Sequence, residues 1–180
     1  MIKMIKRFHL NRAFSALALA AVAAGLLLSP ATAVAAHGED EGSLDAVREA
    51  TDQFHNLDRA KHAGYLSLLS CFDSPGVGGM GQHYVKGRLL DAKVTPEKPE
   101  ALVYEVDGNK LTLVAVEYII PQSVWTKKAA PRLFGRSFFR NDTLGLWALH
   151  AWVWRHNPLG TFANYNPTVK LCPGHSGTGA

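Results

Sequence analysis

Two β-rich segments joined by a short turn constrain the fold of this 180-residue chain more than any other feature. Ala101–Val106 and Leu111–Ile120 contain many β-branched, aromatic and aliphatic residues, and residues 107–110 between them read Asp-Gly-Asn-Lys. An Asp-Gly turn between two such segments predicts an antiparallel hairpin. Pro121 ends the second strand, because proline has no amide hydrogen for the sheet. The chain is therefore expected to fold around an antiparallel sheet.

The segment before the hairpin predicts a helix. From Ser43 to Gly64 apolar residues recur at helical spacing; Ser43 is a suitable N-cap and Gly64 suits the position just past the C-terminus. The last long strand is expected over Leu146–His156, after a long and mostly irregular segment at 122–145 of a length that is often functional. The order of elements predicts an α+β fold, with the N-terminal helix packed on a mainly antiparallel, twisted or partly closed β-sheet.

Residues 1–36 have the pattern of a secretory signal peptide. Four basic residues precede an uncharged apolar run, Ala13–Leu28, which is followed by Ser29-Pro30 and by small residues up to Ala36. The run is shorter than the roughly 20 residues of a membrane-spanning helix. The sequence therefore predicts a cleaved signal peptide at 1–36, a single globular α+β domain at 37–180, and a periplasmic or secreted location.

The net charge of the chain resides in that N-terminal region. The chain has 19 Lys and Arg against 15 Asp and Glu, a formal net charge of +4, and the four basic residues before position 13 account for the whole excess. A domain close to neutral has no global attraction for nucleic acid or anionic membranes. We expect neither nucleic-acid binding nor stable membrane association after cleavage, and the sequence does not define an oligomeric state.

The two cysteines predict a disulfide. Cys71 and Cys172 are the only cysteines of the chain and lie far apart in the sequence. In an oxidising compartment such a pair is more often a disulfide than a metal or redox site. The bond would join the C-terminal tail to the middle of the domain.

The glycine-rich segment Gly76–Gly81 matches the pattern G-x-G-x-x-G without its usual context. A dinucleotide-binding motif needs a helix directly after the glycines, where backbone amides meet the phosphates. Here the strand-like segment Gln82–Lys86 follows. The glycines therefore predict a flexible or tightly turned loop.

Glu117 is the most unusual residue of the predicted hairpin, because it is a carboxylate within an apolar strand. Strand alternation places it on one face with Leu111, Leu113, Ala115 and Ile119. A buried carboxylate has to be paired, protonated or bound to a metal, since burying an isolated charge is very costly.

Two histidines have similar settings on other predicted strands. His150 lies within the last strand, and His83 lies in the segment after the glycines. With Glu117 they predict a 2-His-1-Glu divalent metal site with open coordination positions, although the residue types do not distinguish zinc, copper and iron. His156 and Arg155 are expected to lie next to these ligands.

Other interpretations remain open at this stage. Glu117 would form a purely structural pair with a histidine or with Arg155 or Arg136. Alternatively, the protein is a non-enzymatic module in which Trp152, Trp154 and Tyr165 form an aromatic platform for a sugar or small apolar ligand. A third interpretation is that the protein is a structural exported protein without a ligand. No motif identifies a reaction.

Several segments of the predicted domain resemble a family of uncharacterised exported bacterial proteins. They are the GMGQHYV segment at 79–85, VEY at 116–118, LFGR at 133–136 and LHAWVWRHNP at 149–158. The resemblance implies export and a shared fold, and it implies no activity.

Overall fold

The structure is a computed structural model that describes residues 34–174, with side chains from Ser43 onward except that of Leu69. All of these residues belong to one compact unit, Thr32–Ala180. The predicted signal peptide therefore lies outside the described residues, apart from its last three positions. Within the described part of the chain, no helix is both long enough and apolar enough to cross a membrane.

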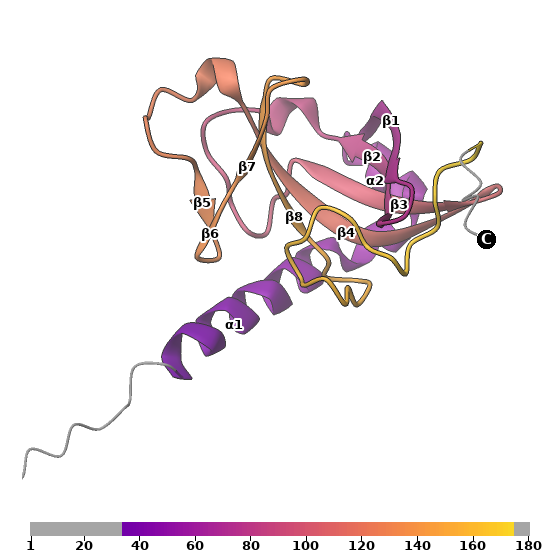
Figure 1. Ribbon diagram of the computed structural model, residues 1–180, viewed down its shortest axis with the longest axis horizontal. Helices are drawn as coiled ribbons and strands as arrows, with labels where there is room; N and C mark the ends of the chain where they lie inside the picture. The colour runs from indigo at the N-terminus through magenta and orange to yellow at the C-terminus, as the bar shows by residue number, and fades with distance from the viewer. Residues whose placement is uncertain (1–33, 175–180) are drawn as a thin grey trace, which may run out of the picture. The chain divides into compact units, whose positions relative to one another are not determined.

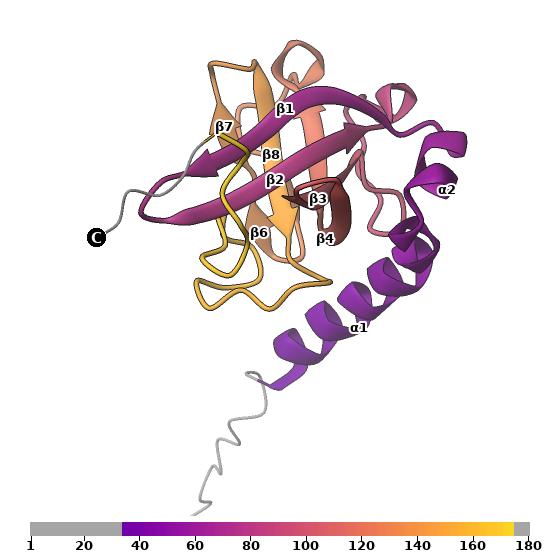
Figure 2. The ribbon, with the colours of Figure 1, turned by 90° about the vertical axis from the view of Figure 1, so that its right-hand side faces the viewer.

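A six-stranded antiparallel sheet dominates the fold (Figures 1 and 2), which confirms the predicted sheet-dominated α+β class. In spatial order its strands are β1 (Leu66–Ser74), β2 (Gly78–Val85), β3 (Ala101–Asp107), β4 (Lys110–Pro121), β8 (Leu146–Ala151) and β7 (Phe139–Asn141). Two short strands, β5 (Arg132–Leu133) and β6 (Arg136–Ser137), form a separate hairpin between β4 and β7 in the sequence.

The predicted hairpin is confirmed as β3 and β4, but it contains a bulge. Asp107 pairs with Lys110 across the turn, and Gly108 has φ +57°, a conformation that favours glycine. Farther along, Val103 pairs with Ala115 and Tyr104 with Leu113, so Val114 has no partner of its own. Such an extra residue reverses the inward and outward alternation of a strand.

The bulge corrects the predicted neighbours of Glu117. Leu111 and Leu113 belong to the core on the opposite face, together with Val116 and Tyr118. The residues that share the face of Glu117 are Ala115 and Ile119, as predicted. The prediction was wrong for the residues before Val114 because it assumed an unbroken alternation.

The helical region is broken into three pieces rather than forming one helix from Ser43. They are α1 (Val34–Thr51), the 3-10 helix η1 (Asp52–His55) and α2 (Leu57–His62). Asn56 separates η1 from α2, and its side-chain oxygen accepts hydrogen bonds from the amides of Asp58 and Arg59, which makes it an N-cap. Gly64, with φ +95°, follows α2 as predicted.

The helical region and one face of the sheet share the main core. Leu44, Val47 and Phe54 are buried in the same cluster as Leu102 and Tyr104 of β3. The Tyr104 hydroxyl donates a 2.7 Å hydrogen bond to the Phe54 carbonyl. The opposite face is covered by less of the chain, and its buried apolar residues form two smaller clusters.

The last strand ends earlier than predicted, at Ala151 instead of His156. Beyond it, the Trp152 amide donates to the Thr161 carbonyl, and the Trp154 amide donates to the carbonyl of the bulged Val114. Trp152 then packs on one side of the sheet and Trp154 on the other. The regular pairing of β8 with β4 therefore stops at Val116 and Ala151.

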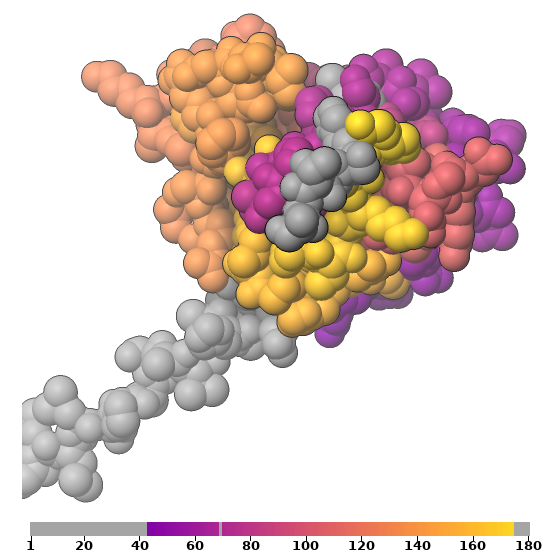
Figure 3. Space-filling model, turned by 45° about the vertical axis from the view of Figure 1, so that its right-hand side comes forward, coloured from indigo at the N-terminus to yellow at the C-terminus, as the bar shows by residue number. Residues whose placement is uncertain are grey.

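The C-terminal segment is tied to β1 and β2 at two places. The predicted disulfide between Cys71 and Cys172 is confirmed, with a Cα–Cα distance of 5.7 Å. Gly79 exchanges backbone hydrogen bonds with Asn166, and a Cβ atom at Gly79 would collide with the carbonyl oxygen of Lys170. Figure 3 shows the C-terminal segment, in yellow, against the β1–β2 hairpin, in magenta. The glycines therefore permit a close approach of two backbones.

Loss of the disulfide is expected to lower the free energy of unfolding by about 4 kcal/mol, because the bond closes a loop of about 100 residues in the unfolded chain. The measurement is urea unfolding of the wild type and of a Cys71→Ser/Cys172→Ser variant. The same shift should follow reduction of the wild type and be absent when the variant is treated with the reductant. An unchanged unfolding midpoint would contradict this expectation.

Candidate metal centre

Three strands bring His83, Glu117 and His150 together on the less covered face of the sheet. Glu117 of β4 lies directly opposite His150 of β8 in the ladder. His83 lies on β2, two strands away from β4, and the intervening β3 contributes Val103 opposite His83 and Ala101 opposite Glu117. The two small apolar clusters of this face flank the group. The predicted convergence of these side chains is therefore present.

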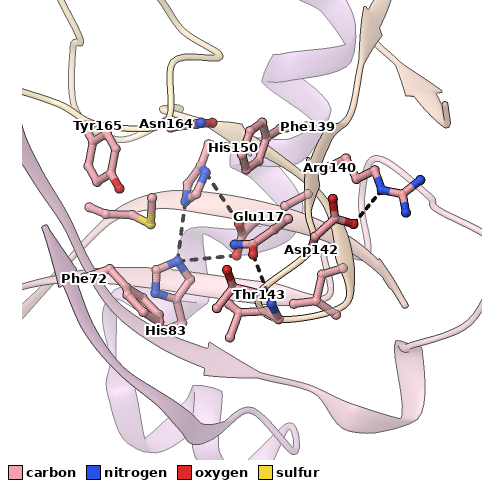
Figure 4. Close-up of a pocket in the computed structure, with 15 residues that line it drawn as sticks. Phe72, His83, Glu117, Phe139, Arg140, Asp142, Thr143, His150, Asn164 and Tyr165 are labelled. Carbon is pink, nitrogen blue, oxygen red and sulfur yellow. Dashed lines mark hydrogen bonds and ion pairs between the residues drawn. The ribbon is translucent and has the colours of Figure 1, made fainter. Parts of the chain in front are cut away.

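The three side chains form a compact group (Figure 4). His83 Nε2 lies 3.4 Å from Glu117 Oε2 and 3.4 Å from His150 Nε2, and His150 Nδ1 lies 3.5 Å from Glu117 Oε1. One possible ligand atom from each residue lies within 4.8 Å of the others. These separations exceed the usual 2.7–3.2 Å of hydrogen bonds. The two distances from His83 Nε2 are close to the roughly 3.3 Å between neighbouring ligands of a tetrahedral ion with bonds of about 2.0–2.1 Å, whereas His150 approaches its two partners with different ring nitrogens.

Burial determines the protonation of the group. The exposed fractions of His83, Glu117 and His150 are 1%, 6% and 2%. Burial, with a smaller contribution from the nearby Glu100 carboxylate, raises the pKa of Glu117 to about 8. Burial also lowers the pKa of His83 to about 4, against a smaller opposing effect of the Gly81 carbonyl, and that of His150 to about 3, with His83 contributing. Without a metal, the three groups are therefore mainly neutral at pH 7.

Hydrogen bonding within the group is incomplete. Among the buried side-chain nitrogens and oxygens of the described residues, His83 Nδ1 is the one that has no hydrogen-bond partner. A neutral imidazole has one donor and one acceptor nitrogen, and buried polar atoms in a purely structural network are normally satisfied. In the part of the chain with described side chains, the ion-pair partners of Glu117 are the two histidines, and neither Arg155 nor Arg136 pairs with it.

The group lies in the wall of a cavity of about 400 Å³. Phe72, Phe139 and Tyr165 contribute aromatic surface around it, and Arg140 and Asp142 form an ion pair at its border (Figure 4). The remaining lining residues are Met80, Asn141, Thr143, Leu144, Leu146, Ala148 and Asn164. A ligand bound by the three side chains would therefore remain accessible to a small molecule.

The residues expected next to the ligands lie elsewhere. Arg155 donates a 2.8 Å hydrogen bond to Glu105 and a 3.1 Å hydrogen bond to the Thr168 carbonyl, and His156 is exposed. The physical reason is the early end of β8 at Ala151, after which the alternation that related these residues to His150 no longer holds.

The predicted aromatic platform does not form as one surface. Trp152 and Trp154 border a second cavity, of about 490 Å³, whereas Tyr165 lines the first. The indole N–H of Trp152 donates to the Ala163 carbonyl, and that of Trp154 donates to the Thr51 hydroxyl. Both tryptophans are thus occupied in packing the protein together.

Sequence reasoning missed most of the cavity wall. Phe139 and Thr143 belong to the long irregular segment, whose length was the one available signal. Asn164 comes from the turn-rich C-terminal segment and Met80 from within the glycine-rich segment. Neither the C-terminal segment nor the glycine-rich segment contained a sequence signal for this cavity.

No protein-family model, curated protein or solved structure matches the chain. The fold and the site define an α+β protein with one disulfide and a buried His–Glu–His group of a kind that can hold a metal ion. Any function has to be inferred from this geometry.

The raised pKa of Glu117 predicts that this residue's contribution to the free energy of unfolding of the metal-free protein falls as the pH rises, whereas the lowered pKa values of His83 and His150 act in the opposite direction below about pH 6.5. An ordinary carboxyl near pKa 4.5 ionises in the unfolded chain, while Glu117 stays protonated in the folded protein up to about pH 8. The contribution of Glu117 to the free energy of unfolding is fully present below pH 4.5. It decreases between pH 4.5 and about pH 8, by at most about 1.4 kcal/mol per pH unit.

Urea unfolding of the wild type and of Glu117→Gln between pH 5 and pH 8, with a chelator present, measures this effect. The free energy of unfolding of the wild type, relative to that of the variant, should decrease over the window, because the two histidines contribute to both proteins. Glu49→Gln, at an exposed helical position, serves as the control and should follow the wild type. Equal slopes for the wild type and Glu117→Gln would contradict the assigned cause.

Proposed function

We propose that this protein is an exported metal-binding protein in which His83, Glu117 and His150 hold a divalent metal ion in the wall of a cavity open to small ligands. The observation that supports this proposal most strongly is that three potential metal ligands are both buried and closely spaced. Three metal-ligand side chains converge in a buried setting, with one ligand atom of each within 4.8 Å of the others, and among the described residues no lysine or arginine forms an ion pair with Glu117. A divalent ion would supply the positive charge that a buried Glu117 carboxylate otherwise lacks.

A purely structural network explains this geometry less well. Two histidines and a glutamic acid that only held the core together would be expected at hydrogen-bonding distances near 2.9 Å with their ring nitrogens satisfied. Here the separations within the group are longer, at 3.4–3.5 Å. Separations too long for hydrogen bonds favour a site in which the side chains face a common ligand.

The position of the group suggests what the site can do. Three protein ligands leave at least one coordination position of a bound ion for water or a small molecule, as in metal sites that act on substrates. A bound ion would polarise a molecule or acidify a water there. The chain's own contribution is to exclude bulk water with Phe72 and Phe139 and to provide hydrogen-bonding groups through Asn164 and Tyr165 at the cavity wall.

Export of the protein is supported by independent features. The first 36 residues have the three-part pattern of a signal peptide, and several segments resemble an exported bacterial family. The disulfide between Cys71 and Cys172 is of a type that persists in oxidising compartments.

Metal analysis of the mature protein, purified without a histidine tag, tests the proposal. We expect about one ion per chain in the wild type, and at least about 100-fold weaker binding in Glu117→Ala and His150→Ala, because each loses a ligand. His156→Ala is the matched control, since His156 is an exposed histidine near the same strand.

The outcomes separate the two interpretations. Native-like circular dichroism of both ligand variants, together with lost metal, supports the proposal. Absence of stoichiometric metal in the wild type, even after refolding with zinc, copper or iron, would refute it. Equal metal loss in His156→Ala would show that the binding does not occur at this group.

Metal binding should release protons. A divalent ion at pH 7 has to displace the proton of Glu117, whose pKa is about 8, whereas the histidines are already neutral. We expect release of about one proton per ion and an affinity that rises about tenfold per unit between pH 6 and pH 7.5, then levels off above pH 8. Calorimetry in buffers of different ionisation enthalpy measures the release, which Glu117→Gln should abolish.

A further inference from the structure

The glycine-rich segment directs a sulfur-containing side chain toward the same cavity as His83. In an unbroken strand, Met80 and His83 would point to opposite faces, because they are three positions apart. Both nevertheless line the 400 Å³ cavity. The pairing of β1 with β2 explains this: Phe72 pairs with Gly81 and Asp73 with Gly79, so Met80 is an extra residue without a partner.

The two glycines beside Met80 make this bulge possible. Gly81 has φ +113°, and a Cβ atom there would lie 2.6 Å from the carbonyl oxygen of Tyr104. Gly79 packs against the backbone of residues 169 and 170, where a side chain would collide. A bulge redirects one side chain at the cost of a regular ladder position, and such bulges are common next to functional sites. The Gly-Met-Gly segment thus presents Met80 to the cavity.

The other side chains of the cavity give Met80 a distinct chemical role. Apart from the three candidate ligands, the lining residues are aromatic or aliphatic, or they carry hydroxyl, amide, carboxylate or guanidinium groups. Met80 alone among the lining residues offers a thioether. Thioether sulfur is a soft ligand that favours Cu(I), whereas zinc and iron sites rely on imidazole, carboxylate and thiolate.

We propose that Met80 is a fourth ligand of the centre and that the ion it holds is copper, with the thioether favouring the reduced ion. This inference rests on the proposed metal function of His83, Glu117 and His150. It also gives a role to the glycine-rich segment, whose resemblance to a nucleotide-binding motif is coincidental. Two histidines and one methionine then bind Cu(I), and Glu117 adds a harder ligand that suits Cu(II).

The test compares metal-free wild type with Met80→Leu, which keeps the size and apolar character of the side chain. Cu(I) affinity is measured by competition with a chromophoric Cu(I) chelator, Zn(II) affinity by competition with a zinc indicator, and the copper ligands by X-ray absorption. Leu144→Ala is the matched control, because it changes another residue of the cavity wall without removing sulfur.

We expect Met80→Leu to weaken Cu(I) binding at least about tenfold, while Zn(II) binding and Leu144→Ala stay close to wild type. The sulfur scatterer should disappear from the absorption spectrum of the variant. If Cu(II) affinity is unchanged, each tenfold loss lowers the reduction potential by about 59 mV.

The failures of the two proposals are distinguishable. If Met80→Leu binds Cu(I) as tightly as the wild type, or if Leu144→Ala weakens it equally, the role of Met80 is refuted. Loss of binding in His150→Ala in the same experiment would then still support the three-residue metal site. If the wild type binds neither copper nor zinc, the proposed function itself fails.

Discussion

The cost of burying Glu117 is the constraint on which the site depends. Its carboxyl lies in the middle of a sheet, on a face where its ion-pair partners among the described residues are two histidines that are themselves neutral. Desolvation therefore keeps the group protonated unless a cation enters. Apolar clusters flank the group, which is the arrangement expected of a site that has to hold a charged ligand.

Two backbone irregularities position the residues around that carboxyl. The bulge at Val114 moves Leu111 and Leu113 to the helix-facing core, so that Glu117 shares its face with smaller neighbours. The bulge at Met80 brings a side chain from the same strand as His83 into the cavity. Both features break a regular hydrogen-bond ladder, and both lie next to the candidate centre, where bulges redirect side chains.

The sequence was sufficient for the sheet, the hairpin, the disulfide and the three convergent side chains, because each had a local or compositional signal. An Asp-Gly turn, a lone carboxylate in an apolar strand and a single pair of cysteines are such signals. The neighbours were not predictable, because alternation fails wherever a bulge inserts one residue. His156 and Arg155 illustrate this, since the strand that should have carried them beside His150 ends at Ala151. Several wall residues, among them Thr143 and Asn164, come from loops, whose path depends on tertiary contacts.

The bond between Cys71 and Cys172 affects more than the stability of the chain. The segment that it anchors also supplies Asn164 and Tyr165 to the cavity and bridges to Gly79 through Asn166. The strands that carry the three candidate ligands are held together by the sheet itself: β4 pairs with β8, and β3 connects β2 to β4. The C-terminal segment, in contrast, supplies one wall of the cavity. In a reducing environment the chain has the same ligands but lacks the covalent tie to that wall. The completeness of the cavity is therefore coupled to the redox state of the compartment in which the protein resides.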